Sequence, residues 1–402
     1  MQTHPTTMDA GLPEEVRALF QWLDTMRDRN QVYHDEGSDS WHVFSYDDVT
    51  KVYADPATFS SDLGSLMPSV PELNLFSRGN IVRMDPPRQR DLRRLVSRAF
   101  TPRMVAGLEP RITEIVTELL DAVDDEFELV EALTYPLPII VIAELLGVPA
   151  SDRHLFRIWA DVMLSGTMGE QEVVLSDDTL RSYVPTMLEM FEYFTAQVAD
   201  RRSRDSDDLI GQLTRVEVDG IRLSDDEIAS FAIVLLVAGH VTTTALLGTT
   251  VLCLDEHLEA MAELRANRDT VPTAIEEALR CRPPFTRNLR RTTREVEFGD
   301  VLIPAERAVS VWLAAANRDP AQFPDPQRFD IRRKANSHLS FGHGIHFCIG
   351  APLARIESRI GLNLLLDRFS DIRVPRDPGP EYYPSASMML GPRRLPLQVK
   401  RA

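Results

Sequence analysis

The feature that most constrains this chain is an apolar run, from Ile228 to Leu254, that contains no Asp, Glu, Lys or Arg. The run is longer than the roughly 18–20 residues that cross a bilayer. A membrane span is disfavoured because Gly239, His240 and several threonines lie in its middle, and because acids rather than basic clusters flank it. We therefore expect a helix inside the core of a soluble protein, either a plain buried helix or one bent around a reactive site.

The overall composition excludes several classes of protein. A net charge of −17 argues against nucleic-acid binding, which needs clustered Lys and Arg. Three cysteines cannot form a disulfide framework without leaving one over, which favours a reducing compartment. The N-terminus has no basic start followed by an apolar run, so no secretory signal is expected. The predicted location is the cytoplasm.

Helical periodicity dominates the chain, and we expect a mainly α fold with a smaller β part, in a single domain over residues 1–402. About residues 1–15 are expected to be disordered. Strands are expected at 41–45 and after Pro283, a long ordered loop at 59–83 and a mobile stretch at 165–178. A capping box of Ser224 and Glu227 opens the apolar helix. The other expected helices cover 12–29, a helix starting at 47, 88–100, 102–125, 136–147, 151–164, 180–203, 207–215 and 351–369.

The strongest chemical signal is FGHGIHFCIGAPLAR, from Phe341 to Arg355. Cys348 precedes a helix with Pro352 in its first turn. The free N–H groups at a helix N-terminus favour a thiolate, which is the form of cysteine that binds metal. The nearby glycines permit turns that expose backbone N–H groups to the sulfur; they are Gly342, Gly344 and Gly350.

Taken alone, these residues leave three interpretations of Cys348 open. A buried structural cysteine is the commonest fate of a free cysteine, but it explains neither the glycines nor the helix start. A zinc site of His343, His346 and Cys348 is conceivable, although no Cys-x-x-Cys pair or fourth ligand is evident. The third interpretation is a haem held by one axial thiolate.

The loop FGHGIHFCIG resembles the haem-binding loop of the cytochrome P450 monooxygenases, complete from Phe341 to Gly350. Other stretches resemble the same family, in the same order: Glu277-Ala278-Leu279-Arg280, PDPQRF with Arg328, ANRDP at 316–320, and residues 84–102. The resemblance covers about residues 40–400 and is nearest to the macrolide-tailoring hydroxylases. It implies the P450 fold and a soluble haem-thiolate monooxygenase.

The resemblance implies a haem b cofactor with Cys348 as the iron ligand. The two haem propionates need cationic or hydrogen-bonding partners, and the family pattern transfers this role to Arg93, Arg290 and His346. Gln89 stands where many relatives have His. The resemblance further implies a buried charge network of Glu277, Arg280 and Arg328 that supports the haem side.

By the same resemblance, the apolar helix crosses the oxygen-binding face of the haem. Gly239 is expected to make room for dioxygen, and the Thr242 hydroxyl to assist proton delivery. Val241 stands where the family has an acid, so the usual acid–alcohol relay is in doubt. Our hypothesis is that ordered water, fixed by a substrate hydroxyl, supplies protons through Thr242. The expected substrate contacts are Val237, Ala238, Thr286, Asn288, Met388 and Met389.

The predicted reaction inserts one oxygen atom of O2 into a bulky natural product, most favourably a macrolide or related polyketide. No GxGxxG fingerprint follows a strand, so electrons from NAD(P)H must arrive through partners, a ferredoxin and its reductase. The expected docking face carries Arg88, Arg90, Arg94 and Arg98. Two alternatives remain: a peroxide-using or oxidative-coupling haem-thiolate enzyme acting on a peptide or other natural product, and a non-catalytic haem-binding protein.

Overall fold

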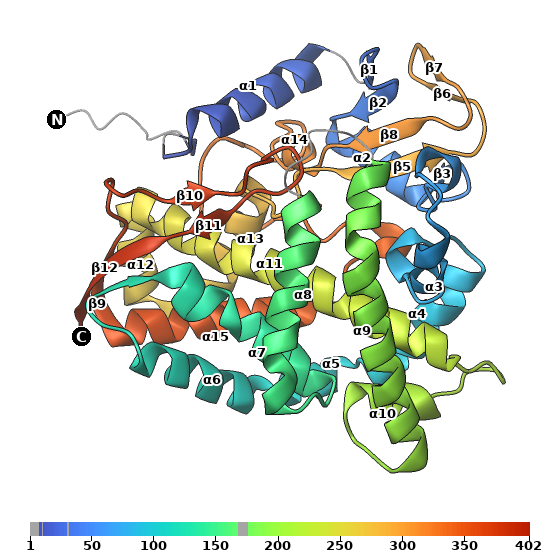
Figure 1. Ribbon diagram of the computed structural model, residues 1–402. Helices are drawn as coiled ribbons and strands as arrows, with labels where there is room; N and C mark the ends of the chain where they lie inside the picture. Colours follow the sequence, from blue (N-terminus) through green and yellow to red (C-terminus); the bar gives the residue numbers. More distant parts are fainter. Residues whose placement is uncertain (1–7, 10, 30–31, 168–175) are drawn as a thin grey trace.

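The uncharged run forms the central part of one long helix, α11 (Asp225–Glu256). The capping box is confirmed: the Ser224 hydroxyl accepts from the Glu227 N–H at 3.3 Å, and the Glu227 carboxylate accepts from the Ser224 N–H at 2.9 Å. Figure 1 shows α11 crossing the whole molecule. The structure is a computed structural model, and it describes all residues except 1–7, 10, 30–31 and 168–175.

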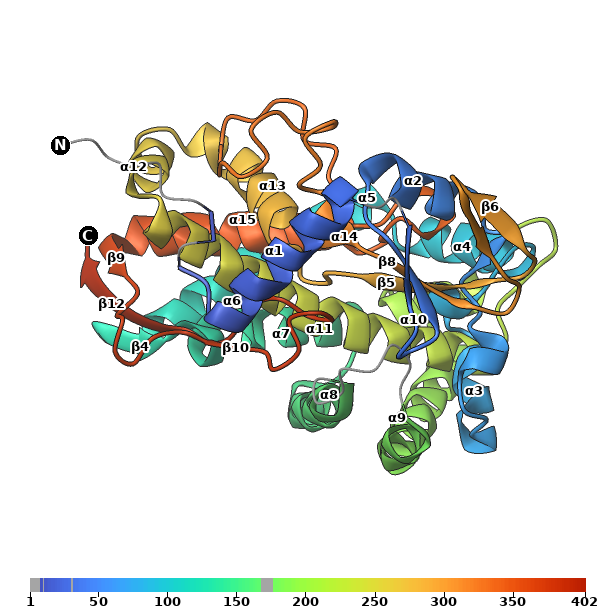
Figure 2. The same cartoon turned by 90° about the horizontal axis from the view of Figure 1, so that it is seen from above.

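Helices from distant parts of the sequence surround α11. Figures 1 and 2 show α8 and α9 side by side across one face of it, and α7, α13 and α15 also contact it. The bounds of the α-helices other than α11 are α1 Glu14–Arg29, α2 Tyr46–Ala54, α3 Asn74–Ser77, α4 Arg88–Ala99, α5 Pro102–Gly107, α6 Glu109–Asp121, α7 Pro136–Leu145, α8 Arg153–Thr167, α9 Asp177–Ser203, α10 Leu209–Arg215, α12 Leu258–Ala266, α13 Val271–Cys281, α14 Leu313–Ala316 and α15 Ala351–Arg368.

The β part is small: the largest sheet lies at one end of the helical body, and β9, β10, β11 and β12 lie on the opposite side (Figure 1). Its largest sheet has the strand order β1-β2-β8-β5-β3, in which only β2 and β8 are parallel. A second sheet has the order β4-β12-β9, and β6–β7 and β10–β11 form two-stranded sheets. The strands are β1 Val32–Asp35, β2 Ser40–Val43, β3 Phe59–Ser60, β4 Glu126–Glu128, β5 Asn288–Thr292, β6 Val296–Phe298, β7 Val301–Ile303, β8 Ala308–Val311, β9 Phe369–Arg373, β10 Glu381–Tyr382, β11 Pro392–Arg394 and β12 Pro396–Arg401.

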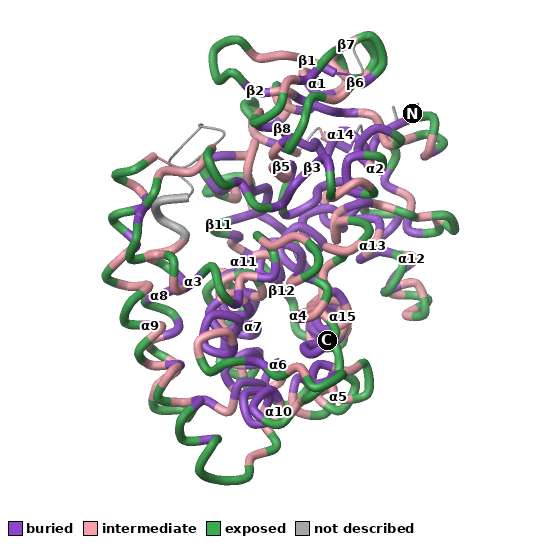
Figure 3. Tube along the Cα trace, turned by 90° about the vertical axis from the view of Figure 1, so that its right-hand side faces the viewer, coloured by how far each residue is buried: buried purple, intermediate pink, exposed green. Residues whose placement is uncertain are grey.

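The main hydrophobic core forms where α11 meets its neighbours. Figure 3 shows α7, α11 and α15 largely buried, whereas α9 exposes much of its length. In the most apolar window of α11, 72% of the residues are buried inside the protein. A helix that already buries most of its apolar surface against other helices has little left to offer to lipid, so α11 is a core helix.

Two sequence expectations need correction, and a third falls mostly on residues that the structure does not describe. Residues 102–125 do not form one helix: α5 ends at Gly107 and α6 starts at Glu109, because Pro110 lacks an N–H and is tolerated only in a first turn. The loop 59–83 contains short helical turns, among them α3 and the 3-10 turn Ile81–Arg83. The stretch 165–178 lies mostly outside the described residues.

The expectation of disorder over residues 1–15 is also wrong for the part that the structure describes. Met8 is only 1% exposed, and its carbonyl accepts from the buried Arg282. The Asp9 carboxylate accepts two hydrogen bonds from Arg318, at 2.8 and 2.9 Å. Two buried arginines therefore tie this segment to the helical body, and α1 follows from Glu14.

Candidate active site

A cavity of about 350 Å³ lies between α11 and the loop that carries Cys348. Ala238, Gly239 and Thr242 of α11 line one wall, and the loop from Phe341 to Gly350 lines the other. The rest of the wall is largely apolar and comes from α11, the 3-10 turn Ile81–Arg83 and the segment before β5. The cavity thus joins the two most informative sequence motifs in one site.

The Cys348 loop owes its shape to glycines with positive φ. Gly342 (φ +73°) and Gly344 (φ +66°) adopt a backbone that other residues rarely reach, and the Cys348 N–H then donates to the carbonyl of Phe341 at 2.8 Å. Burial raises the pKa of the Cys348 thiol, while the N–H groups of Gly350 and Ala351 oppose that rise. The helix start alone therefore does not secure the thiolate; a coordinated metal cation deprotonates a thiol outright.

A clamp that the sequence analysis missed holds this loop to α13. Arg355 of α15 lies over the Phe341 ring at 4.5 Å and donates twice to Glu276 at 2.7 Å. His338 lies 3.2 Å from the same carboxylate. Burial opposes ionisation, but Arg355 and His338 bring the pKa of Glu276 down to about 2. The available signal was Glu276, an acid directly before the expected Glu277.

Three arginines border the cavity: Arg93 of α4, Arg290 of β5, and Arg83, which the sequence analysis did not single out. No carboxylate stands among the described residues that line the cavity. None of these three guanidinium groups has an ion pair within the described part of the chain. Burial lowers the pKa of each. A group of unpaired cations at one wall is a binding site for anions.

Of the two adjacent arginines Arg290 and Arg291, only the expected propionate residue Arg290 lines the cavity. The Arg290 guanidinium lies 5.0 Å from the Tyr53 ring centroid at the cavity wall. Arg291 instead points away and pairs with Glu306. Asn288 donates to the Tyr53 hydroxyl at 2.7 Å, so Tyr53 and Asn288 together position Arg290.

His346 and Gln89 take different places around the cavity. His346 lines the wall, and its buried Nε2 has no hydrogen-bond partner in the protein. Burial and the nearby Arg290 bring the pKa of His346 down to about 4, so the ring is neutral. Gln89 does not line the wall; its amide donates to the carbonyl of Ile345 at 2.8 Å and supports the loop from behind.

On the opposite wall, the Thr242 hydroxyl donates to the carbonyl of Ala238 at 2.7 Å. This bond satisfies the hydroxyl within its own helix and leaves its oxygen at the cavity surface. A β-carbon added to Gly239 would lie 2.7 Å from Cδ1 of Ile142 in α7. Gly239 lines the cavity, but its small size also serves the close approach of α7 to α11.

Val241 does not line the cavity. Its side chain is buried in a cluster with Ala245, Tyr383 and Met389, because neighbouring helix positions point about 100° apart. The expectation that Val241 belongs to the reaction site therefore needs correction: the residue packs α11 against the C-terminal segment, and Thr242 beside it faces the cavity.

The six expected substrate contacts divide into two groups. Ala238 and Asn288 line the cavity. Thr286 is fully buried and donates to the carbonyl of Ala386 at 2.9 Å. Val237, Met388 and Met389 contribute to packing around the C-terminal turn and α11. The four expected contacts that the wall does not include are Val237, Thr286, Met388 and Met389.

The buried charge network exists, but one of its expected members is wrong. Arg280 donates twice to the Glu277 carboxylate at 2.8 Å, and both side chains have no exposed surface. The second cation is Arg333, whose Nε lies 3.1 Å from both carboxylate oxygens. Arg328 is exposed and contributes only its backbone carbonyl. The correct residue lies five positions further along the same loop.

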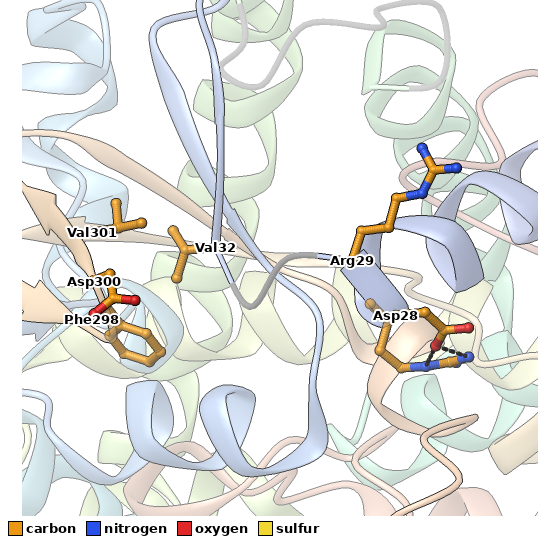
Figure 4. A pocket seen from close by; sticks show the side chains of 7 residues that line it. Asp28, Arg29, Val32, Phe298, Asp300 and Val301 are labelled. Atoms are coloured by element: carbon orange, nitrogen blue, oxygen red, sulfur yellow. Dashed lines mark hydrogen bonds and ion pairs between the residues drawn. The ribbon is translucent and has the colours of Figure 1, made fainter.

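A second hollow, shown in Figure 4, lies where α1 ends near β6 and β7. Its charged side chains do not converge: Arg27 is held by Asp28 at 3.1 Å, and Figure 4 shows Arg29 pointing away from Asp300. It has no arrangement of groups for chemistry.

The residues around the main cavity fit a haem. Cys348 supplies a sulfur ligand, and the opposite wall carries a hydroxyl and a glycine. The unpaired arginines and the unpartnered Nε2 of His346 suit two propionates. Among the described residues, no group of three His, Cys, Asp or Glu is placed to hold a metal ion, which leaves the zinc interpretation without support there. The site defines a haem-thiolate protein.

Comparisons with known proteins agree. The family model for cytochrome P450 matches residues 177–399. The cyclomarin C epoxidase CymV of Salinispora arenicola is 46% identical, over 98% of each chain. The erythromycin C-12 hydroxylase of Saccharopolyspora erythraea is 41% identical, over 98% of this chain and 97% of that one. The ligand-free structure of cytochrome P450 TbtJ1 is 44% identical and superposes with a TM-score of 0.88, covering 97% of this chain and all of that one.

This chain belongs to the cytochrome P450 family and has the P450 fold. It is a monooxygenase of the oxidoreductase class whose cofactor is a haem iron, and it uses O2 and reducing equivalents. Its relatives include proteins named for the hydroxylation and epoxidation of natural products.

Proposed function

We propose that this P450 inserts one oxygen atom of O2 into a bulky natural product in secondary metabolism, with hydroxylation of a macrolide or related polyketide as the favoured reaction. One observation carries the proposal: Cys348 and the Thr242 face of α11 line the same, largely apolar cavity. Two of its relatives are named as an epoxidase and a hydroxylase of natural products. A substrate of this kind would be oriented by a few polar groups in a mostly apolar pocket.

The residues of this chain have distinct tasks in that reaction. Haem, when bound to Cys348, supplies the activation of O2. Arg93, Arg290 and His346 would hold the propionates, and Phe341 and Gly350 shape the ligand loop. Gln89 would act through that loop.

Proton delivery would depend on Thr242. Its hydroxyl can donate or accept at the cavity surface, and its present acceptor is the Ala238 carbonyl. The family's acid position holds Val241, which has no carboxylate. Its side chain is also buried on another face of the helix. We propose that water, ordered by a hydroxyl of the substrate, exchanges protons with Thr242 Oγ1.

The proposed electron supply is NAD(P)H through a ferredoxin reductase and a ferredoxin, with the enzyme in the cytoplasm. Arg88 pairs with Glu227 and Arg94 with Asp219, so these two are partly neutralised. Arg90 and Arg98 are exposed and unpaired within the described part of the chain, and we place the docking of the acidic partner there. Unchanged reduction rates in Arg90→Glu/Arg98→Glu would contradict this placement.

The substrate proposal is tested by titrating the purified holoenzyme with a panel of macrolides and peptides. The expected result is a shift of the haem to high spin with a macrolide, followed by an NADPH-dependent product heavier by one oxygen. A panel in which only peptides shift the spectrum contradicts the macrolide assignment. Equal product formation from peroxide alone would favour a peroxide-using enzyme over the O2 reaction.

A further inference from the structure

The cavity has three arginines at its wall, one more than the number of propionates on a haem. Arg83, Arg93 and Arg290 all face it. In ferric haem thiolate, the charges of the iron, the porphyrin dianion and the thiolate cancel, which leaves the two propionates as the net charge. If each propionate takes one arginine, the third arginine either shares a propionate or binds another anion.

Two nearby acids, Asp62 and Asp85, favour the charged arginines, but neither forms an ion pair with them within the described part of the chain. Asp62 stabilises the charged form of Arg83 only from beyond ion-pair distance, and its carboxylate accepts from the Gly64 N–H at 2.9 Å. Asp85 acts at similar range on Arg290 and is occupied by the Ser61 N–H at 2.9 Å and by the Ser60 hydroxyl. Each carboxylate already has backbone partners, and neither reaches the guanidinium groups.

Arg83 differs from the other two arginines in its position. It ends the 3-10 turn Ile81–Arg83, before α4, and next to Val82, which borders the apolar part of the cavity with 52% of its surface exposed. Arg83 itself is exposed, yet burial among protein atoms lowers its pKa. A side chain that faces an internal cavity rather than bulk water has both properties: its surface is accessible, and protein atoms still surround its charged group. Its guanidinium has neither an ion pair nor a hydrogen bond within the described residues.

We propose that Arg83 is a carboxylate-binding residue of this cavity. A guanidinium can take a carboxylate through two parallel N–H donors, and a buried one gains most from such a pair. Two sources supply this chemistry here: a haem propionate that Arg83 shares with Arg290, or an acidic group on the substrate. The inference rests on the proposed function, because it needs the cavity to hold haem.

The test compares Arg83→Met and Arg83→Lys with the exposed Arg103→Met as the matched control and Arg93→Met as the reference for a propionate contact. All are measured as holoenzyme, after the carbon-monoxide spectrum of the reduced protein has shown equal haem-thiolate content. The first measurement is the rate of haem transfer to apomyoglobin. If Arg83 holds a propionate, Arg83→Met loses haem about tenfold faster than Arg103→Met, and Arg83→Lys restores part of the difference.

The second measurement is the spin-shift titration with dodecanoate and with dodecan-1-ol. If Arg83 holds a substrate carboxylate, haem loss is unchanged, while the preference of the wild type for dodecanoate falls about tenfold in Arg83→Met and partly returns in Arg83→Lys. Unchanged haem loss together with an unchanged ratio of the two dissociation constants overturns the proposal. A wild-type protein without the thiolate band would instead contradict the proposed function.

Discussion

At the residue scale, two threonines of α11 make the same bond in different surroundings. Thr242 donates to Ala238 and lines the cavity, whereas Thr250 donates to Leu246 at 2.8 Å inside the core. The bond itself is ordinary for a helical threonine. Any chemical role of Thr242 must therefore come from its position at the cavity, which makes Thr250 a matched control.

We expect Thr242→Ala to consume NADPH at a rate near that of the wild type but to yield roughly 10²-fold less product. The reason is that removing one proton-transfer group lowers the productive step by roughly 10²-fold or more when no other group replaces it. The measurement is the ratio of product formed to NADPH oxidised, with peroxide quantified alongside. Thr250→Ala is expected to keep the wild-type ratio. Equal coupling in all three proteins would show that Thr242 is not needed.

A buried acid in α15 predicts an unusual dependence of stability on pH. Glu357 is 1% exposed, one of its oxygens has no partner, and burial raises its pKa from 4.5 to about 8. The folded protein thus keeps a proton that the unfolded chain releases above pH 4.5. This stabilisation is fully present below that pH and is lost as the pH rises through 8.

Glu357→Gln should remove this dependence. The variant is expected to gain roughly 2–3 kcal/mol relative to the wild type between pH 6 and pH 9, or a few degrees in Tm. The measurement is thermal unfolding of both holoenzymes at the two pH values and one scan rate. A Tm difference that stays constant across the range would mean that Glu357 is ionised in the folded protein.

At the scale of elements, Glu277 joins α13 to the loop 326–336, which follows α14 in the chain. Its carboxylate accepts from Arg280 and Arg333, and also from the Asn336 amide at 3.1 Å. The adjacent Glu276 pairs with Arg355 of α15 at 2.7 Å. One turn of α13 thereby supports both the loop 326–336 and the helix that follows Cys348.

Arg333→Ala should therefore destabilise the holoenzyme strongly, by about 3–5 kcal/mol, because it leaves part of a buried carboxylate charge unpaired. Arg328→Ala removes only an exposed side chain and is expected to cost less than about 1 kcal/mol. The check is the Tm and haem content of both variants. If Arg328→Ala proves the more damaging, the assignment of the network is wrong.

The positions of helices along the chain could be predicted from the sequence more accurately than the contacts between side chains of different elements. The capping box fixed the start of α11 because its two hydrogen bonds are local. The break at Pro110 was readable from local chemistry but was overlooked. The orientation of Val241 and the partner of Glu277 depend on packing between distant segments, which no local spacing reports.

At the scale of the whole molecule, one site is assembled from parts far apart in the chain. Arg93, Ala238, Arg290 and Cys348 come from four separate elements and meet at one cavity. The resemblance named all four of these residues, because motif order fixes their positions, while their roles stay predictions. Arg83 and Tyr53 could not be anticipated, since only the folded chain shows that they face the cavity. The Arg355–Glu276 clamp left one signal in the sequence, the acid beside Glu277, but its partner in α15 is visible only in the folded chain.

The central claim is that Cys348 is the thiolate ligand of a haem in this cavity. The most direct test is the carbon-monoxide difference spectrum of the reduced, haem-loaded protein, recorded for the wild type and for Cys348→Ser. Cys253→Ser is the control, because Cys253 is buried in the core away from the cavity. We predict the red-shifted Soret band of a thiolate-bound haem in the wild type and in Cys253→Ser, and its loss in Cys348→Ser. A wild type without that band, or a band that survives in Cys348→Ser, would contradict the claim.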